Sequence, residues 1–203
     1  MTAAQKLTAE QGKTLLRIAR GAIARAFSHK EVEIPHEQWL KDKAGIFVTV
    51  HNPDDSLRGC IGYTESVMSL RETVKNAAVQ AAFHDPRFEP VKENEVDRLK
   101  IEITILTKPE EIIVSEPREL LKKVIIGRDG LIAKYGPYSG LLLPQVPVAE
   151  NWDVETFLGQ TCWKAGLDPS SWLDKKTKFF KFEGQIFAET KSGAVVEKKM
   201  MRR

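Results

Sequence analysis

Within residues 99–107, apolar and polar side chains alternate from Leu99 to Ile105, and this alternation constrains the fold more than any other segment. The apolar positions are Leu99, Ile101, Ile103 and Ile105. The polar positions between them are Lys100, Glu102 and Thr104. Successive side chains of a strand point to opposite faces, so the pattern predicts a half-buried strand of the kind found in antiparallel sheets.

Helices and further strands are predicted on both sides of this segment. Polar capping residues followed by apolar side chains at helical spacing predict three helices, over residues 8–28, 69–83 and 153–166. Turn-forming residues between apolar runs predict one hairpin over 45–63 and a second one around Gly127–Gly130. Residues 178–189 are predicted as a late strand pair or a strand bent at Gly184. Strands joined by short turns, with helices between some of them, predict an α+β fold with a mostly antiparallel sheet and flanking helices.

Composition narrows the class of protein. The chain has 203 residues, of which 42% are hydrophobic, which is enough for one well-packed domain. No apolar run has the length of a membrane span, and the first residues lack the apolar core of a signal peptide, so we expect a cytoplasmic protein without membrane contact. Cys60 and Cys162 are the only cysteines, and we expect both to be thiols.

The distribution of charge argues against a dedicated nucleic-acid module. The net charge is +3, but residues 191–203 carry five basic side chains against one acidic side chain. That balance of +4 leaves −1 for the rest of the chain. A nucleic-acid module usually has its basic excess on the fold itself. We therefore predict a basic flexible tail over 191–203 rather than a binding arm.

The segment 57–63 is the first candidate for a functional site. Arg58 stays charged and therefore marks an anion or a carboxylate partner. Gly59 and Gly62 remove side chains where a ligand or another strand comes close. Cys60 between them is a possible thiolate, or a small buried apolar residue in a tightly packed strand. Both interpretations stay open at this point.

Two further segments carry polar residues in predicted loops. His84 and Asp85 follow the second helix and provide a possible base for Cys60, while Arg87 provides a possible clamp for an anion; a helix stop followed by a turn is the alternative. The apolar run 140–143 is followed by Pro-Gln-Val-Pro, which is predicted to leave the strand in extended form. The side-chain amide of Gln145 in this segment is then a candidate ligand contact. The alternative is a core strand that runs into an edge loop.

Metal and cofactor binding receive little support from the sequence. The four histidines are scattered, and none forms a pair with the spacing of metal ligands. No phosphate-binding or dinucleotide-binding glycine pattern is present in segment 57–63. We predict neither a metal nor a cofactor.

Taken in order, the quoted segments resemble the signature of the AMMECR domain family: residues 57–62 (LRGCIG), 84–88 (HDPRF) and 140–146 (GLLLPQV), with later blocks at 126–131 and 152–167. The resemblance implies one domain over residues 8–190, an α+β fold whose two lobes surround a cleft, and signature residues near that cleft. It also implies an intracellular protein with a functional link to Memo-type and radical-SAM proteins. It assigns no reaction. Tyr138 and Ser139 stand where some members carry an arginine, so no arginine-dependent contact is implied there.

Three functions remain as hypotheses, and whether the chain is an enzyme is left open. The first is a cleft that binds a small anionic or polar ligand through Arg58, Gly59, Gly62, Arg87 and Gln145, with catalysis undecided. The second is a thiol-dependent enzyme in which Cys60 is the nucleophile, His84 the base and Asp85 the residue that orients it. The third is a non-catalytic adaptor or nucleic-acid-associated regulator that uses the basic tail together with Arg58 and Arg87. We favour the first.

Overall fold

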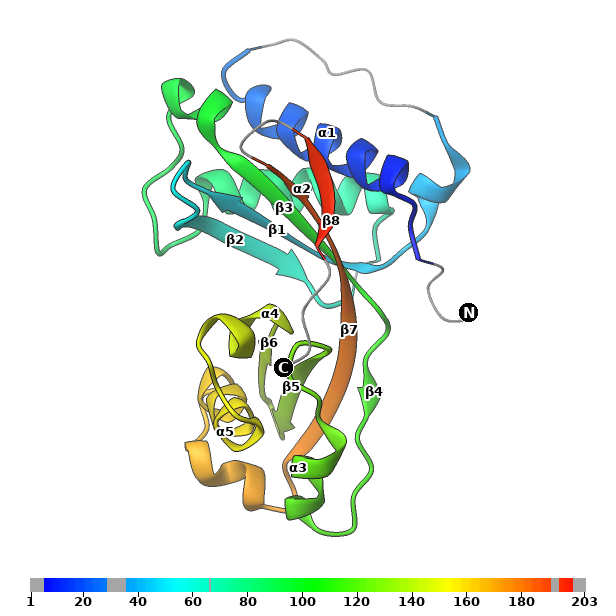
Figure 1. Ribbon diagram of the computed structural model, residues 1–203, viewed down its shortest axis with the longest axis vertical. Helices are drawn as coiled ribbons and strands as arrows, with labels where there is room; N and C mark the ends of the chain where they lie inside the picture. The colour runs from blue at the N-terminus through cyan, green and yellow to red at the C-terminus, as the bar shows by residue number, and fades with distance from the viewer. Residues whose placement is uncertain (1–5, 29–35, 66, 191–193, 199–203) are drawn as a thin grey trace. The chain divides into compact units, whose positions relative to one another are not determined.

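The computed structural model describes residues 6–28, 36–65, 67–190 and 194–198 (Figure 1). Its α-helices are α1 (Ala9–Ala24), α2 (Leu70–Phe83), α3 (Leu120–Lys123), α4 (Gln145–Ala149) and α5 (Val154–Lys164). Its 3-10 helices are η1 (Gln38–Lys41), η2 (Glu93–Arg98), η3 (Pro117–Glu119) and η4 (Pro169–Leu173). Its strands are β1 (Gly45–His51), β2 (Leu57–Tyr63), β3 (Lys100–Leu106), β4 (Glu110–Glu111), β5 (Asp129–Tyr135), β6 (Tyr138–Leu142), β7 (Lys178–Glu189) and β8 (Val195–Lys198).

The eight strands form a sheet of order β2-β1-β3-β7-β5-β6, with β4 and β8 each paired to β7. Every pairing described residue by residue is antiparallel. The predicted α+β class with an antiparallel sheet and helices is therefore confirmed. Residues 178–189 form one long strand, β7, rather than a pair of strands.

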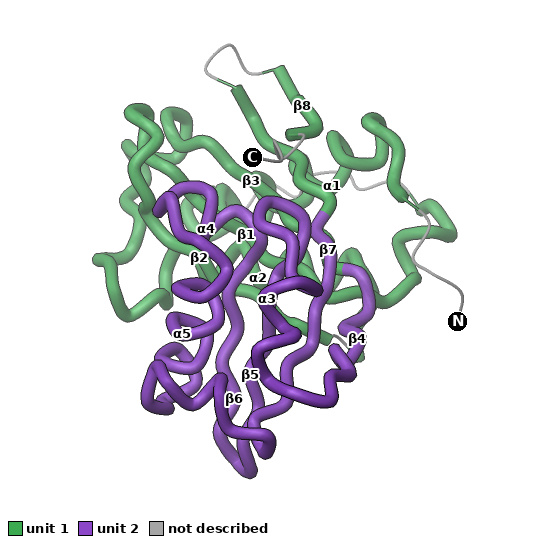
Figure 2. The backbone as a smooth tube through the Cα atoms, turned by 60° about the horizontal axis from the view of Figure 1, so that its bottom comes forward, with its two compact units in different colours: residues 1–106, 185–198 green, residues 107–184, 199–203 purple. Residues whose placement is uncertain are grey.

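The chain divides into two compact units, shown in different colours in Figure 2. Unit 1 comprises residues 1–106 and 185–198, and unit 2 comprises residues 107–184 and 199–203. The boundary falls inside β7, after Gly184, so this strand contributes to both units. The predicted domain limits and the predicted cleft stay predictions.

Unit 1 is built on the hairpin of β1 and β2 and on the pairing of β1 with β3. Alternate residues of β1 and β3 are apolar and buried, and they form one core with residues of α1 and α2. The capping box predicted at the start of α1 is present: the Thr8 hydroxyl accepts from the Gln11 amide at 3.2 Å, and the Gln11 side chain accepts from the Thr8 amide at 2.8 Å. The predicted helices and hairpin of this unit are confirmed.

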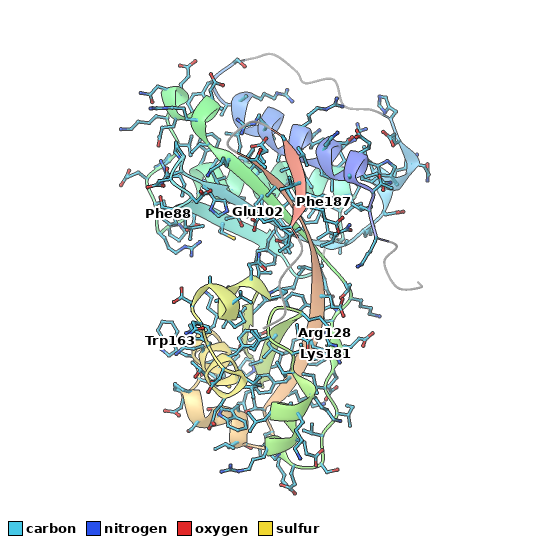
Figure 3. The ribbon with its side chains drawn as sticks, viewed as in Figure 1. Phe88, Glu102, Arg128, Trp163, Lys181 and Phe187 are labelled. Atoms are coloured by element: carbon cyan, nitrogen blue, oxygen red, sulfur yellow. The ribbon has the colours of Figure 1, made fainter. Side chains whose placement is uncertain are left out.

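Strand β3 differs from its prediction in exposure. The alternation predicted one solvent face, but all seven residues from Lys100 to Leu106 are buried. The strand lies inside the sheet order, and its charged residues have partners: Lys100 pairs with Asp55, and Glu102 (labelled in Figure 3) accepts from Lys198 Nζ at 2.5 Å. Sequence periodicity reports the direction of side chains, whereas burial depends on what packs over each face.

Unit 2 contains β4, β5, β6 and the first part of β7, with α5 packed on the β5–β6 hairpin. Phe157, Leu158 and Cys162 of α5 share a buried core with Leu131 of β5 and Phe179 of β7. The predicted third helix, capped by Asp153 with Thr156 N–H at 2.8 Å, is confirmed.

Two local predictions in unit 2 are wrong. Residues 124–126 form no strand, so Gly127–Gly130 is no hairpin turn; the hairpin joins β5 to β6 and turns at Gly136, where φ is +54°. Pro-Gln-Val-Pro is not extended either. Pro144 has φ −60° and ψ −26°, and Gln145 begins α4. Proline at 147 lies in the first turn of α4, where a helix needs no amide donor.

The structure tests the predictions about the C-terminal tail and about membranes only in part. Within the predicted tail 191–203, residues Val195–Lys198 form β8 and pair with β7 of unit 1, whereas 191–193 and 199–203 lie outside the described residues. In the described ranges, no helix combines the length and apolar character that crossing a membrane requires.

Candidate functional site

Strand β2 lies at one end of the sheet order, so one of its two long sides has no neighbouring strand among the described residues. In the register of unit 1, Cys60 of β2 lies opposite Thr49 of β1, and Thr49 lies opposite Glu102 of β3. Three polar side chains therefore form a row across three strands, on the sheet face opposite to the apolar residues that pack on α1 and α2.

The thiol of Cys60 is half-buried and lies 3.1 Å from the Thr49 hydroxyl oxygen. Burial raises the pKa of Cys60, and the opposing effects of the Thr49 hydroxyl and the Arg87 charge are smaller. Cys162 in α5 is completely buried, and burial raises its pKa to about 12. Neither cysteine is in the electropositive surroundings that stabilise a thiolate.

These surroundings predict slow alkylation of Cys60 at neutral pH. We expect N-ethylmaleimide to label Cys60 no faster than glutathione, because the raised pKa lowers the thiolate fraction. Cys162 should stay unlabelled until the chain unfolds. Mass spectrometry of peptides after timed labelling measures both rates. Labelling of Cys60 clearly faster than glutathione would contradict this prediction, and its slowing in His84→Ala would then favour the thiol-enzyme hypothesis.

Asp85 and Arg87 close the free side of β2 at Cys60. The Cys60 amide donates to Asp85 Oδ2 at 2.9 Å, and Arg87 Nη2 donates to the Cys60 carbonyl at 3.2 Å. Arg87 also holds the Asp85 carboxylate through two bonds, from Nε at 2.9 Å and from Nη2 at 2.6 Å. We call this arrangement of Cys60, Asp85 and Arg87 the edge clamp. It gives the Cys60 backbone the donor and acceptor that a neighbouring strand would otherwise supply.

The two charged side chains of the edge clamp differ in their exposure to solvent. The Asp85 side chain is 2% exposed, whereas that of Arg87 is 50% exposed. Hydrogen bonds from Arg87, together with those from the Cys60 and Arg87 amides, hold the pKa of Asp85 far below its usual range. The same ion pair raises the pKa of Arg87. Asp85 is therefore ionised, buried and fixed, and it holds the guanidinium of Arg87 in one orientation.

Arg58 has a carboxylate partner inside unit 1. Its guanidinium bonds the Glu95 carboxylate at 3.3 Å and the carbonyl groups of Glu89 and Pro90 at 2.6 and 3.2 Å. The Lys92 amide and then Arg58 lower the pKa of Glu95. Of the two partners that the sequence left open for Arg58, the structure supplies the carboxylate.

His84 ends α2 and is exposed. Its amide donates to the Gln80 carbonyl at 2.9 Å, and its ring makes no hydrogen bond or ion pair with any residue in the described ranges. The two oxygens of Asp85 bond Cys60 and Arg87 instead. The predicted role of Asp85 in orienting His84 therefore has no geometric support.

Gly59 and Gly62 of β2 lie where other parts of the chain leave no room for a Cβ atom. A Cβ atom at Gly59 would lie 2.0 Å from the Ala81 carbonyl oxygen of α2. A Cβ atom at Gly62 would lie 2.3 Å from the Ile46 carbonyl oxygen and 2.5 Å from the Phe47 Cα atom. The close approach predicted from the sequence is thus made by helix α2 and strand β1.

The structure brings some of the predicted site residues together and leaves others apart. Cys60, Asp85 and Arg87 form the edge clamp, while Arg58 lies two residues away on the same strand. Gln145 is the first residue of α4 and belongs to unit 2, whereas all the others belong to unit 1. Among the described residues there is no cluster of three or more side chains suited to a metal ion.

Two residues with roles at the site were not predicted from the sequence. Thr49 contacts the Cys60 thiol, and Glu95 pairs with Arg58. Thr49 could have been found, since it is a polar residue flanked by Val48 and Val50 in a buried strand and the hairpin register places it opposite Cys60. Glu95 lies 37 positions from Arg58, and no local pattern indicates that contact.

The fold and the edge clamp define an α+β protein whose distinctive residues gather on an edge strand. Comparison with family models matches residues 16–187 to the AMMECR1 family. The chain belongs to the AMMECR1 family, which confirms the resemblance found in the sequence.

Relatives and a solved structure agree with this membership. Protein MJ0810 of Methanocaldococcus jannaschii is 48% identical over 198 residues, which is 96% of this chain and 98% of that protein. Protein NEQ441 of Nanoarchaeum equitans is 49% identical over 177 residues, covering 86% and 98%. The crystal structure of the uncharacterized protein PH0010 from Pyrococcus horikoshii matches with a TM-score of 0.89 at 46% identity, covering 96% of this chain and 100% of that one.

Proposed function

We propose that the chain binds a small anionic or polar ligand at the edge clamp, with Arg87 as the main contact. One observation carries this proposal. Asp85 fixes the Arg87 guanidinium through Nε and Nη2, while Nη1 makes no hydrogen bond with a described residue and the side chain is half exposed. A half-exposed guanidinium that is fixed next to a half-buried thiol is a preorganised binding element, because little side-chain freedom remains to be lost on binding.

The neighbouring groups indicate how such a ligand would be recognised. Asp85 neutralises the charge of Arg87, so recognition depends on the direction of the Nη1 donor rather than on net charge. The Arg87 guanidinium lies 5.4 Å from the centre of the Phe88 ring, which offers an apolar surface beside the donor. Arg58, Gly59 and Gly62 serve this site through the backbone of β2, since their own contacts lie within the protein.

The proposal is tested by protection of Cys60. We expect malonate, a small dicarboxylate, to slow labelling of Cys60 by N-ethylmaleimide in a saturable manner. Arg87→Lys keeps the charge but loses the planar donor, so protection should weaken about tenfold or more in this variant. Arg17→Lys is the matched control, because Arg17 lies exposed on α1 of the same unit and has no contact with the edge clamp. Mass spectrometry of the Cys60 peptide gives the rates.

Two results would contradict the proposed function. One is labelling of Cys60 that malonate and citrate leave unchanged at millimolar concentration. The other is equal protection in the wild-type protein and in Arg87→Lys, which would show that any bound anion does not use the Nη1 donor. A parallel thermal denaturation of each variant ensures that lost protection does not reflect unfolding.

A further inference from the structure

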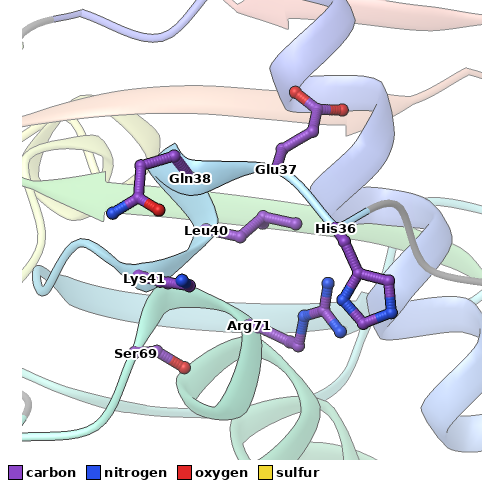
Figure 4. A pocket seen from close by; sticks show the side chains of 7 residues that line it. All are labelled: His36, Glu37, Gln38, Leu40, Lys41, Ser69 and Arg71. Atoms are coloured by element: carbon purple, nitrogen blue, oxygen red, sulfur yellow. The ribbon is translucent and has the colours of Figure 1, made fainter.

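A second candidate site lies in unit 1 at the other end of helix α2. A cavity of about 280 Å³ opens between η1 and the start of α2 (Figure 4). Its lining residues are His36, Glu37, Gln38, Leu40, Lys41, Ser69 and Arg71. Helix α2 has 14 residues, which corresponds to about 21 Å at 1.5 Å per residue. The edge clamp follows the last residue of that helix, so the two sites share no residue.

The lining is rich in groups that bind anions. Lys41 and Arg71 carry positive charges, and His36 adds an imidazole ring. Lys41 makes no ion pair with any residue in the part of the chain that the structure describes. Glu37 is the one carboxylate in the lining, and it accepts from the Trp39 indole N–H. In Figure 4 its carboxylate points away from Arg71 and His36.

The backbone of α2 does not account for binding at this cavity. Among the first N–H groups of the helix, that of Leu70 donates to the Asp42 carbonyl at 2.7 Å and that of Thr73 to the Ser69 carbonyl at 2.8 Å. The Glu72 N–H donates to the Ser69 hydroxyl oxygen at 3.3 Å. This leaves the hydroxyl hydrogen of Ser69 to serve as a donor. Side chains, rather than these three helix amides, therefore carry the capacity of the cavity to bind.

We propose that this cavity binds the phosphate group of a small phosphate monoester. A guanidinium, an ammonium and a hydroxyl around one cavity supply the donors that a tetrahedral dianion accepts. A volume of about 280 Å³ lies just below the range of cavities that hold drug-sized molecules, so it suits a phosphate with a small organic group. Leu40 and Gln38 provide the contact surface for that group.

Isothermal titration of the full chain with inorganic phosphate and with glycerol phosphate tests this site. Sodium chloride keeps the ionic strength constant. We expect both probes to bind, with glycerol phosphate binding more tightly because the organic group adds contacts. Lys41→Gln and Arg71→Gln should each weaken binding about tenfold, the usual effect of losing one charge-assisted hydrogen bond.

Matched variants separate this site from general attraction of anions and from the edge clamp. Lys43→Gln removes a positive charge that is exposed two residues from Lys41 but does not line the cavity, and binding should stay within twofold. Absence of binding by either probe, or an equal loss in Lys43→Gln and Lys41→Gln, would overturn this second site. A loss in Arg87→Lys alone would assign the phosphate to the edge clamp instead.

Discussion

Replacing Gly59 by alanine is expected to lower the free energy of unfolding by about 3 kcal/mol or more. The added Cβ atom would lie 2.0 Å from the Ala81 carbonyl oxygen and 3.0 Å from the Ala81 carbonyl carbon. Both atoms belong to the backbone of α2, so no flexible side chain can move aside. The helix or the strand must shift. Residues of α2 belong to the buried core of unit 1, and Ile61 and Tyr63 of β2 pack against that core. Urea denaturation followed by circular dichroism measures the change.

Gly159→Ala in α5 is the matched control for this prediction. Its Cβ atom would lie 3.3 Å from the nearest atom, the Pro169 carbonyl oxygen, which is a tight contact but no overlap. Alanine also gains up to about 1 kcal/mol of helix propensity over glycine, which offsets that contact. We expect a change close to zero. Equal stability of Gly59→Ala and the wild-type protein would show that β2 and α2 are farther apart than the structure places them.

Asp85→Asn is expected to cost about 2–3 kcal/mol at neutral pH, because it removes a buried carboxylate that accepts hydrogen bonds from Arg87 and from two amides. This loss of stability is smaller than the loss expected on breaking a fully buried ion pair, since Arg87 is half exposed and can form hydrogen bonds with water. The amide side chain also brings two donors to a position where the wild-type group only accepts. Chemical denaturation of wild type and variant gives the difference.

The pH dependence of that difference identifies ionisation as its cause. The pKa of Asp85 is lowered in the folded state, so its contribution is complete above the unfolded value of about 3.9 and is lost as the pH falls below it. The difference between wild type and Asp85→Asn should therefore shrink in acid. Asp97→Asn, at an exposed position of η2, should change stability by less than about 0.5 kcal/mol. A difference at Asp85 that does not vary with pH would exclude the ionised carboxylate as its source.

Most elements of the fold could be predicted from the sequence, because their signals are local. Capping residues such as Thr8 and Asp153 start helices at the predicted positions, and the hairpin of β1 and β2 follows from apolar runs around a turn. The errors occurred where local patterns allow two outcomes. Gly127–Gly130 has the composition of a hairpin turn but forms the end of the α3–β5 connection and the first two residues of β5. Pro144 fits the start of a helix as well as an extended exit.

The residues of the candidate site could be predicted from the sequence, but their contacts could not. The sequence singled out Cys60, Asp85 and Arg87, and the structure joins them. It placed Asp85 with His84, whereas the carboxylate faces the backbone of β2 and the side chain of Arg87. This choice depends on how the chain turns after α2, and neighbours along the sequence do not reveal it.

The family, the α+β class and the identity of the distinctive residues can be read from the amino-acid sequence, since they depend on composition, periodicity and order along the chain. What those residues contact can be seen only in the folded protein. Gly59 accommodates helix α2, Arg58 binds Glu95, and the edge clamp closes the free side of β2. Hydrogen bonding and burial are properties of neighbours in space, and these partners lie 22 to 37 residues away along the chain.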